Sequence, residues 1–592
     1  MSVESFDPSD RKSFGTVLDR RKQSTSITTS TEDHGTKSKM LKKAKQGEMP
    51  AFPGDYEIIK LELHSPNRKG FIDLRLNWSD LNIYEDMFAN CLTASITMTD
   101  GVGLREHVPI IGEESIHLHL RTKGIKKERA EAVNPGPFLG SEPDGIINLK
   151  FRVYKISPST ELSEGGVMFT LYLISEEFII NTQRKVRKAW EFPVRISRMV
   201  KELYEQVFKR GRPLSKKIFI EPTLNLSNLI IPNYTPFKAM NFLASRAISS
   251  GKHAAGSSFV FYETVKGFHF VSIETLMSGG GMGYRSAEGA EEGAEMIYTA
   301  PENPVKEVYT IQPKGLHMHK DPNRDTAVEM ISVSSYNFTS NFDVVQNLQK
   351  GMYANRLLTH DLVRMKYDTM DFNYVDPENL EQKVEHDPAT GATTVTEVKK
   401  TAADAKKFSD DFTHLGKGKL CSPDQDALGF PDGHICFYPT NFAHEVRFKE
   451  DIGSMGVHGT PKGNMNIISN RVEQWMQSGL VQRQELENVK VNIRAPGMST
   501  RCIGDLIEFK LPTTDTTDRD SDAPATPHKY YSGYYLITKL RHHFSNEKYE
   551  IEFEAVKDSL HSGVNAESSS ADSARITPTS QEQTSAKLSG PR

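Results

Sequence analysis

The chain has 592 residues and a formal net charge of −4 at pH 7. This length exceeds what a single hydrophobic core usually holds, so we expect roughly two to four domains. The small net charge excludes a general attraction to polyanions, although basic clusters occur locally. Four cysteines lie far apart and form no CxxC spacing, which predicts neither a zinc knuckle nor a disulfide framework; they are Cys91, Cys421, Cys436 and Cys502.

Both ends of the chain are polar. Residues 1–53 and 561–592 are rich in Ser and Thr and nearly free of large apolar side chains, so we expect two flexible extensions. Residues 1–50 lack the apolar core of a secretion signal. No stretch approaches the roughly 18 apolar residues of a membrane-spanning helix, so we expect no membrane span.

Residues 54–190 carry short segments in which apolar and polar residues alternate, as in half-buried strands. Such spacing predicts a closed or nearly closed antiparallel β-barrel, with a Pro/Gly- and charge-rich insertion at 122–144. The expected strands are 58–63, 71–76, 92–98, 115–120, 147–153 and 167–173.

Residues 191–325 change to a mixed pattern that predicts a small α+β module. Apolar residues recur at helical spacing within 191–208, and Thr235-Pro236 is a typical helix start. Two apolar runs flank Val265-Lys266-Gly267, which indicates a hairpin. The Gly-rich segment 277–304 has no Lys-Ser/Thr after Gly283, so a linker is favoured over a phosphate loop.

Residues 326–375 and 432–560 are predicted to form a second barrel. Its first part should contain an alternating strand, a short helix capped by Asp343 and ended by Gly351, and a long strand from Met352 to Tyr367. Its second part should contain a helix at 464–486 and four strands, at 489–494, 504–511, 533–544 and 549–556. Residues 376–431 are predicted to form an inserted polar arm. The predicted fold class is mainly β with α+β parts: two similar antiparallel barrels, a helix/hairpin module and the arm.

The candidate metal-binding residues are pairs of histidines. His117 and His119 are two apart in a strand and therefore face the same side, as metal ligands can, but no third ligand is near in sequence. His317 and His319 repeat this spacing in a loop. His542 and His543, like His360 and Asp361, are adjacent and should face opposite sides. Because no hydrolase, kinase or phosphate-loop motif occurs, we expect no enzyme activity and no cofactor, and assign no catalytic, cofactor-binding or metal residue.

Several segments resemble the central baseplate hub protein of contractile-tailed bacteriophages of the T-even type, which is related to the hub part of type VI secretion spike proteins. The resemblance covers about 55–375 and 432–560. Seven segments carry it: Leu81-Asn-Ile-Tyr-Glu-Asp-Met-Phe, Ile96-Thr-Met-Thr-Asp-Gly, Pro109-Ile-Ile-Gly-Glu-Glu, residues 230–247, residues 259–270, Gly351-Met-Tyr and residues 532–544.

This resemblance implies a non-enzymatic homotrimer on the central axis of the tail baseplate of a virion, assembled in the host cytoplasm. Two barrels per chain would give three chains a pseudo-six-fold ring between a six-fold tail tube and a three-fold cell-puncturing spike. The implied partners are tail-tube-initiating ring proteins, the spike or tail-lysozyme protein, the tape-measure protein and baseplate wedge proteins. DNA would pass through the lumen during genome ejection.

Two other hypotheses stay open at this point. The chain could be a cell-wall-degrading tail hydrolase, with the 376–431 arm shaping its cleft, or a peripheral receptor-binding tail protein. A hydrolase would clear peptidoglycan in a zymogram, and a receptor-binding protein would bind cells by itself and lie off the tail axis.

Overall fold

The computed structural model describes most of residues 52–123, 146–277, 331–374 and 472–560, with short gaps, together with short segments between 284–311 and between 382–439. Within these residues, no helix combines the length and the apolar character needed to cross a membrane. Several predicted segments lie outside the described residues. They are the two terminal extensions, most of the 122–144 insertion, most of the Gly-rich linker, the His317 and His319 pair and much of the polar arm.

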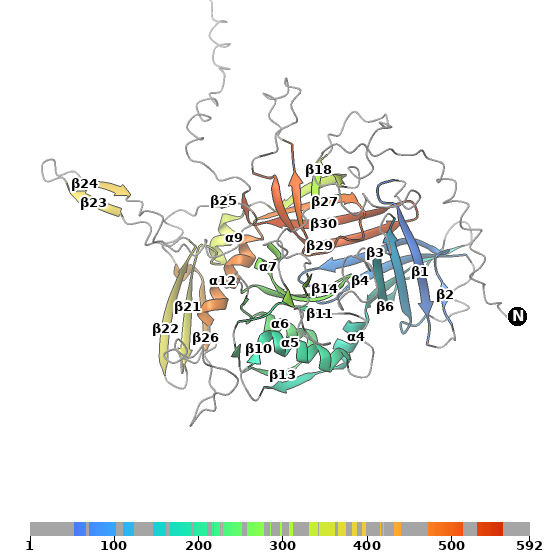
Figure 1. Cartoon of the computed structure of the whole chain (residues 1–592), viewed down its shortest axis with the longest axis horizontal. Coiled ribbons are helices and arrows are strands. Elements are labelled where there is room, and N and C mark those ends of the chain that lie inside the picture. Colours follow the sequence, from blue (N-terminus) through green and yellow to red (C-terminus); the bar gives the residue numbers. More distant parts are fainter. Residues whose placement is uncertain are drawn as a thin grey trace, which may run out of the picture.

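A 15-stranded sheet runs through both β-rich halves of the chain (Figure 1). The strands of the first half pair in the order β3-β4-β8-β6-β5-β1-β2, with β7 beside β8. Their bounds are β1 (Tyr56–His64), β2 (Ile72–Asp73), β3 (Trp78–Asp86), β4 (Thr93–Asp100), β5 (Ser115–Thr122), β6 (Ile146–Ile156), β7 (Thr160–Glu161) and β8 (Val167–Ser175).

The second half supplies six of the other strands, and the seventh, β18, comes from the end of the segment 191–325. They are β18 (Glu307–Ile311), β19 (Ser332–Val333), β20 (Ser335–Ser340), β27 (Val489–Pro496), β28 (Leu506–Lys510), β29 (Gly533–Ser545) and β30 (Tyr549–Lys557). The long strand β29 pairs with β28, with β30 and with β3 of the first half. The prediction of purely antiparallel pairing is wrong for β18, which runs parallel to both β19 and β28 in this sheet.

Alternation in the sequence explains why these strands share one sheet and one core. Every second residue of β4 is buried, and β27 shows the same period. The buried residues of both halves belong to one continuous apolar cluster. The mainly β class is confirmed, but among the described strands the pairing does not close either half into a barrel.

The middle module lies beneath the large sheet in the view of Figure 1. Its strands are β9 (Val186–Ala189), β10 (Val194–Arg195), β11 (Ile218–Ile220), β12 (Leu226–Ser227), β13 (Ile230–Tyr234), β14 (Phe259–Thr264), β15 (Gly267–Ser272), β16 (Tyr284–Arg285) and β17 (Ile297–Tyr298). Its helices are α4 (Glu176–Gln183), α5 (Ile196–Tyr204), extended by a π-helical turn at Glu205–Lys209, α6 (Pro236–Ala244) and α7 (Ile273–Met277).

The predicted hairpin is confirmed as β14 and β15, and both of its faces are buried. Phe261 and Phe268 pack in the cluster that contains α5 and α6, whereas Val260 and Val271 join the core of the large sheet. A hairpin covered on both sides has no polar face, which explains its nearly continuous apolar sequence.

Helix α6 begins where Thr235-Pro236 predicts, but not by the predicted cap. The Thr235 side chain makes no capping hydrogen bond. Instead the Phe237 amide donates to Asn181 Oδ1 of α4 at 2.8 Å. The first turn of α6 is therefore tied to the preceding helix.

A third part combines two helices with a small sheet. Its elements are α9 (Val344–Gln349), β21 (Ala354–Asp361), β22 (Lys366–Asn373), a 3₁₀ turn (Pro431–Gly433), β26 (Ile435–Pro439) and α12 (Val472–Glu485). The cap of α9 is confirmed, since Asp343 Oδ1 accepts from the Gln346 amide at 2.9 Å. Gly351, with φ of 72°, follows the helix as expected.

The single strand predicted from Met352 to Tyr367 is wrong. The chain turns back between β21 and β22, and β21 also pairs in parallel with β26. Met365 takes a positive φ of 54° near this turn. No glycine or proline marks the turn in the sequence, so the alternating pattern runs through it.

Part of the arm is held against the second half. The arm contains the hairpin β23 (Gln382–His386) and β24 (Thr393–Glu397), followed by β25 (Gly418–Lys419). Strand β25 pairs with β31 (Ser559–Leu560), and the Leu415 amide donates to Asp558 at 3.0 Å. The division into six sequence segments stays a prediction.

Candidate interaction site at the junction of the two halves

The two halves meet where β3 pairs antiparallel with β29. The register runs from Asp86 opposite Lys539 to Asp80 opposite Ser545. These strands are more than 450 positions apart in sequence (Asp80 to His543, |i−j| = 463). Backbone pairing makes the halves one surface, because an inter-strand ladder fixes both the spacing and the direction of its strands.

On the buried side of this pairing, Glu85 of the first half contacts both the middle module and the second half. One carboxylate oxygen accepts from the Val265 amide of the middle hairpin at 2.8 Å, and the other accepts from the Ile503 amide of the second half at 2.9 Å. His542 on β29 is fully buried beside it, with Nε2 3.8 Å from Glu85 Oε1. His542 Nδ1 also lies 2.7 Å from the Tyr549 hydroxyl. These buried polar contacts of Glu85 and His542 fix the position of the two paired strands.

A second buried carboxylate holds the middle module to the first half. Glu263 on β14 accepts from the Leu92 amide at 2.9 Å and from the Ser175 hydroxyl at 3.0 Å. It also forms an ion pair with Lys216, which lies 3.2 Å from Glu177. Burial raises the pKa of Glu263, partly offset by the Lys216 ammonium. Burial by itself lowers the pKa of Lys216, but the two glutamates more than compensate and raise it.

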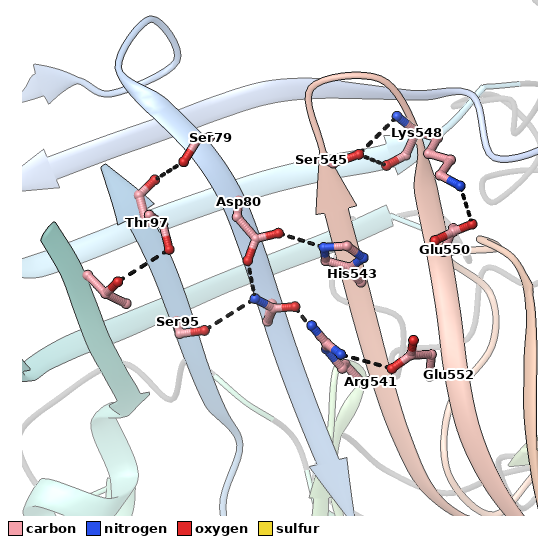
Figure 2. Close-up of polar contacts among 12 residues, drawn as sticks. Ser79, Asp80, Ser95, Thr97, Arg541, His543, Ser545, Lys548, Glu550 and Glu552 are labelled. Carbon is pink, nitrogen blue, oxygen red and sulfur yellow. Dashed lines mark hydrogen bonds and ion pairs between the residues drawn. The ribbon is translucent and has the colours of Figure 1, made fainter. Parts of the chain in front are cut away.

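The opposite face of the junction is polar, and Figure 2 shows it across β4, β3, β29 and β30. Asp80 accepts from Asn82 Nδ2 at 2.6 Å and lies 2.5 Å from His543 Nε2. Arg541 donates to Asn82 Oδ1 at 2.9 Å and to Glu552 at 2.8 Å.

Charge alternates from strand to strand on this face. Acidic Asp80 and Asp86 on β3 are followed by Lys539 and Arg541 on β29. The next strand, β30, carries acidic residues opposite them, with Glu554 3.3 Å from Lys539. Beyond it, Arg494 of β27 lies 3.6 Å from Glu552. Neighbouring charges on these strands are thus compensated.

The structure places the members of each described histidine pair in different surroundings. His542 and His543 face opposite sides, as expected, one toward Glu85 and the other toward Asp80. His117 and His119 do not form a ligand pair. The group of possible metal ligands found in the described residues joins His117 instead to Glu62 and His64 of the neighbouring strand. Sequence reasoning missed this group because its members are brought together by strand pairing, not by short spacing.

Two of the cavities among the described residues are a small one and an open one. One beside α7 and α12 has a volume of about 10 Å³, no more than one water needs. The other is an open groove of about 520 Å³ along the basic segment 184–188. Two basic side chains of this groove already have partners: Lys188 lies 2.9 Å from Glu202, and Arg187 donates to Asn233 at 2.8 Å.

No protein-family profile and no curated protein sequence matches this chain. Among solved structures, the chain is similar to phage tail proteins and to type VI secretion components. The tail protein from Neisseria meningitidis MC58 has 8% identity and a TM-score of 0.37 over 85% of this chain and 97% of that one. The 43 kDa tail protein of prophage MuSo2 from Shewanella oneidensis has 8% identity and a TM-score of 0.39 over 85% and 99%.

A third similar structure is an Escherichia coli type VI secretion component, described as structurally similar to the T4 bacteriophage tail proteins gp27 and gp5. It has 8% identity and a TM-score of 0.32 over 85% of this chain and 77% of that one.

Proposed function

We propose that this chain is the central structural hub of a contractile-tail baseplate. Three copies form a pseudo-six-fold ring that adapts a six-fold tail tube to a three-fold cell-puncturing spike. The hub lies on the tail axis of the virion and is assembled in the host cytoplasm. Its partners are the tube-initiating ring, the spike, the tape-measure protein and the baseplate wedges. It acts as a scaffold and not as an enzyme.

One observation carries this proposal. Two of the segments that resemble the hub family, 81–88 and 532–544, fold as β3 with its following turn and as β29, and these two strands pair with each other. A third such segment, 259–270, forms the hairpin whose Val265 amide is bound by Glu85. Three of the seven resembling segments therefore meet where the two halves and the middle module join, although they are distant in sequence.

Symmetry explains why one chain would carry two β-rich halves. A homotrimer presents three copies of any one surface, so six alike contacts need two alike surfaces in each chain. The proposed hub therefore has two β-rich halves, at 54–190 and at 326–375 with 432–560, on either side of a middle module at 191–325. Joining the halves edge to edge through β3 and β29 would set the angle between them.

A lumen that DNA crosses should not retain it, and the polar face of the junction has the charge compensation that such a lumen needs. A cationic channel binds phosphates and releases counterions, which favours a bound state. The ion pairs between β29 and β30 leave few uncompensated cations on this face. A scaffold that DNA passes would need such a surface.

The test is the copy number and position of the chain. Native mass measurement of the purified protein should show three copies, and an image reconstruction of the particle end should place them around the tail axis. A strictly monomeric protein, or one located at the tail periphery, would overturn the proposal. Peptidoglycan zymography with the same sample should show no clearing, and clearing would favour the hydrolase hypothesis.

A further inference from the structure

Three side chains with metal-binding atoms converge on the outer face of the first half. Glu62 and His64 are two residues apart in β1, and His117 of β5 lies directly opposite Glu62 in the register. One ligand atom from each residue lies within 4.8 Å of the other two. The imidazole ring centroids of His64 and His117 are 4.1 Å apart, and His64 Nε2 is 3.2 Å from Glu62 Oε2.

The surroundings already neutralise most other charges near this group. Lys150 of β6, opposite His117, lies 3.2 Å from Glu176, which is also 3.9 Å from Arg152. Asp73 of β2 lies opposite Glu62, but Arg75 donates to both of its oxygens at 2.9 Å. The carboxylate of Glu62 is therefore the anion in direct reach of the two imidazoles.

The two imidazole rings lie close together, with their centroids 4.1 Å apart. Two protonated rings at this distance would repel each other, whereas neutral rings can bind one ion between them. The hydrogen bond between His64 and Glu62 does not involve His117, so it does not by itself account for the approach of all three groups.

The geometry points to a divalent transition-metal site, in which Glu62, His64 and His117 bind an ion such as Zn²⁺. Two imidazole nitrogens and one carboxylate oxygen are a ligand set that Zn²⁺ accepts, with water completing a tetrahedral shell. The ion would tie β1, which has only the short strand β2 on its outer side, to β5. His119, two residues along the same strand from His117, stays outside the site.

The test uses the full chain without a histidine tag, freed of metal with EDTA and titrated with Zn²⁺ alone or Co²⁺ alone. We expect saturable Zn²⁺ binding in calorimetry and a Co²⁺ absorption band in the visible range. His117→Asn, His64→Asn and Glu62→Gln should each weaken binding more than about tenfold, since loss of even an outer partner of a ligand costs that much. His119→Asn is the matched control and should bind as the wild type does.

Binding should also weaken as the pH falls, because protons compete with the ion for the imidazole nitrogens. Wild-type protein without saturable binding would overturn the proposal. Wild-type affinity in the His64→Asn and His117→Asn variants would overturn it too, since the ion would then lie elsewhere. Unchanged circular dichroism and unfolding temperature in the metal-free variants would show that lost binding is not lost folding, and Glu62→Gln provides a variant that leaves both rings in place.

Discussion

At the scale of single residues, the junction depends on the buried carboxylate of Glu85. We expect Glu85→Ala to lower the free energy of unfolding by roughly 2–4 kcal/mol. The change leaves the Val265 and Ile503 amides without their acceptor, and each unsatisfied buried group costs about 1–3 kcal/mol. The midpoint of urea denaturation, followed by circular dichroism, measures the loss.

The matched control is Glu552→Ala on the polar face of the same junction. Glu552 pairs with Arg541 at 2.8 Å, but both side chains are about one-third exposed (36% and 35%). Water screens such a pair, so its loss should cost less than about 1 kcal/mol. Equal losses in the two variants would show that the buried links of Glu85 do not hold the parts together.

Lys557 gives the second half a specific dependence on pH. Its Nζ donates to the carbonyls of Tyr530 at 2.9 Å and Ser532 at 2.7 Å, while burial lowers its pKa to about 8. The unfolded chain holds this proton up to about pH 10.4, so between about 8 and 10.4 the unfolded state binds more protons than the folded state. Stability should therefore rise with pH in this window through Lys557, by at most ~3 kcal/mol.

The measurement compares the wild type with Lys557→Met from pH 7 to pH 10. Subtracting the stability of the variant from that of the wild type cancels the contribution of buried phenols and thiols. That contribution has the opposite dependence on pH and is the same in both proteins. We expect the wild type to gain stability relative to the variant as the pH rises above 8. Parallel curves would contradict the lowered pKa.

At the scale of elements, periodicity predicted most strands of the large sheet, because one face of each is buried and the other is polar. Strands β4, β5, β27 and β30 are examples. Periodicity did not predict strands in which buried polar residues interrupt the alternation. Strand β3 was not separated out as an element, since its Asn82 and Glu85 are buried against partners more than 150 residues away. The pairing of β1 with β5 also brings Glu62, His64 and His117 together, and the spacing of these residues in the sequence does not indicate this.

The end of α9 allows a test of how this helix is fixed to the small sheet. Gly351 has φ of +72°, and a Cβ there would lie 2.6 Å from His434 Cβ. Gly351→Ala should therefore lower stability by roughly 1–3 kcal/mol, combining backbone strain with the displacement of β26. Chemical denaturation measures the change.

Gly433→Ala is the control for that variant, because no atom lies within 4 Å of its added Cβ. Gly433 stands beside His434 in the same segment, so the two changes probe one neighbourhood. The control should change stability by no more than about 0.5 kcal/mol. A similar loss in both would mean that the close approach at Gly351 is not what fixes the helix end.

At the scale of the whole molecule, the proposed ring requires that β3 and β29 of the same chain pair with each other. A cysteine pair, Tyr84→Cys with Arg541→Cys, tests this, because these residues lie directly opposite across the two strands. Opposite Cα atoms in an antiparallel pair are about 4.5–5.5 Å apart, within the reach of a disulfide. We expect oxidation to cross-link the halves within one chain, so that a non-reducing denaturing gel shows monomers while native mass measurement still shows three copies.

The comparison pair is Thr93→Cys with Arg541→Cys. Thr93 lies opposite Tyr84 on the far strand, so two strand spacings separate it from Arg541. Two spacings amount to about 9–10 Å, beyond the reach of a disulfide, and this pair should not cross-link. Covalent dimers or trimers from the Tyr84 and Arg541 pair would mean that β29 pairs with β3 of a neighbouring subunit. The two halves would then be joined by assembly and not by folding, and the angle between them could not be set before the ring forms.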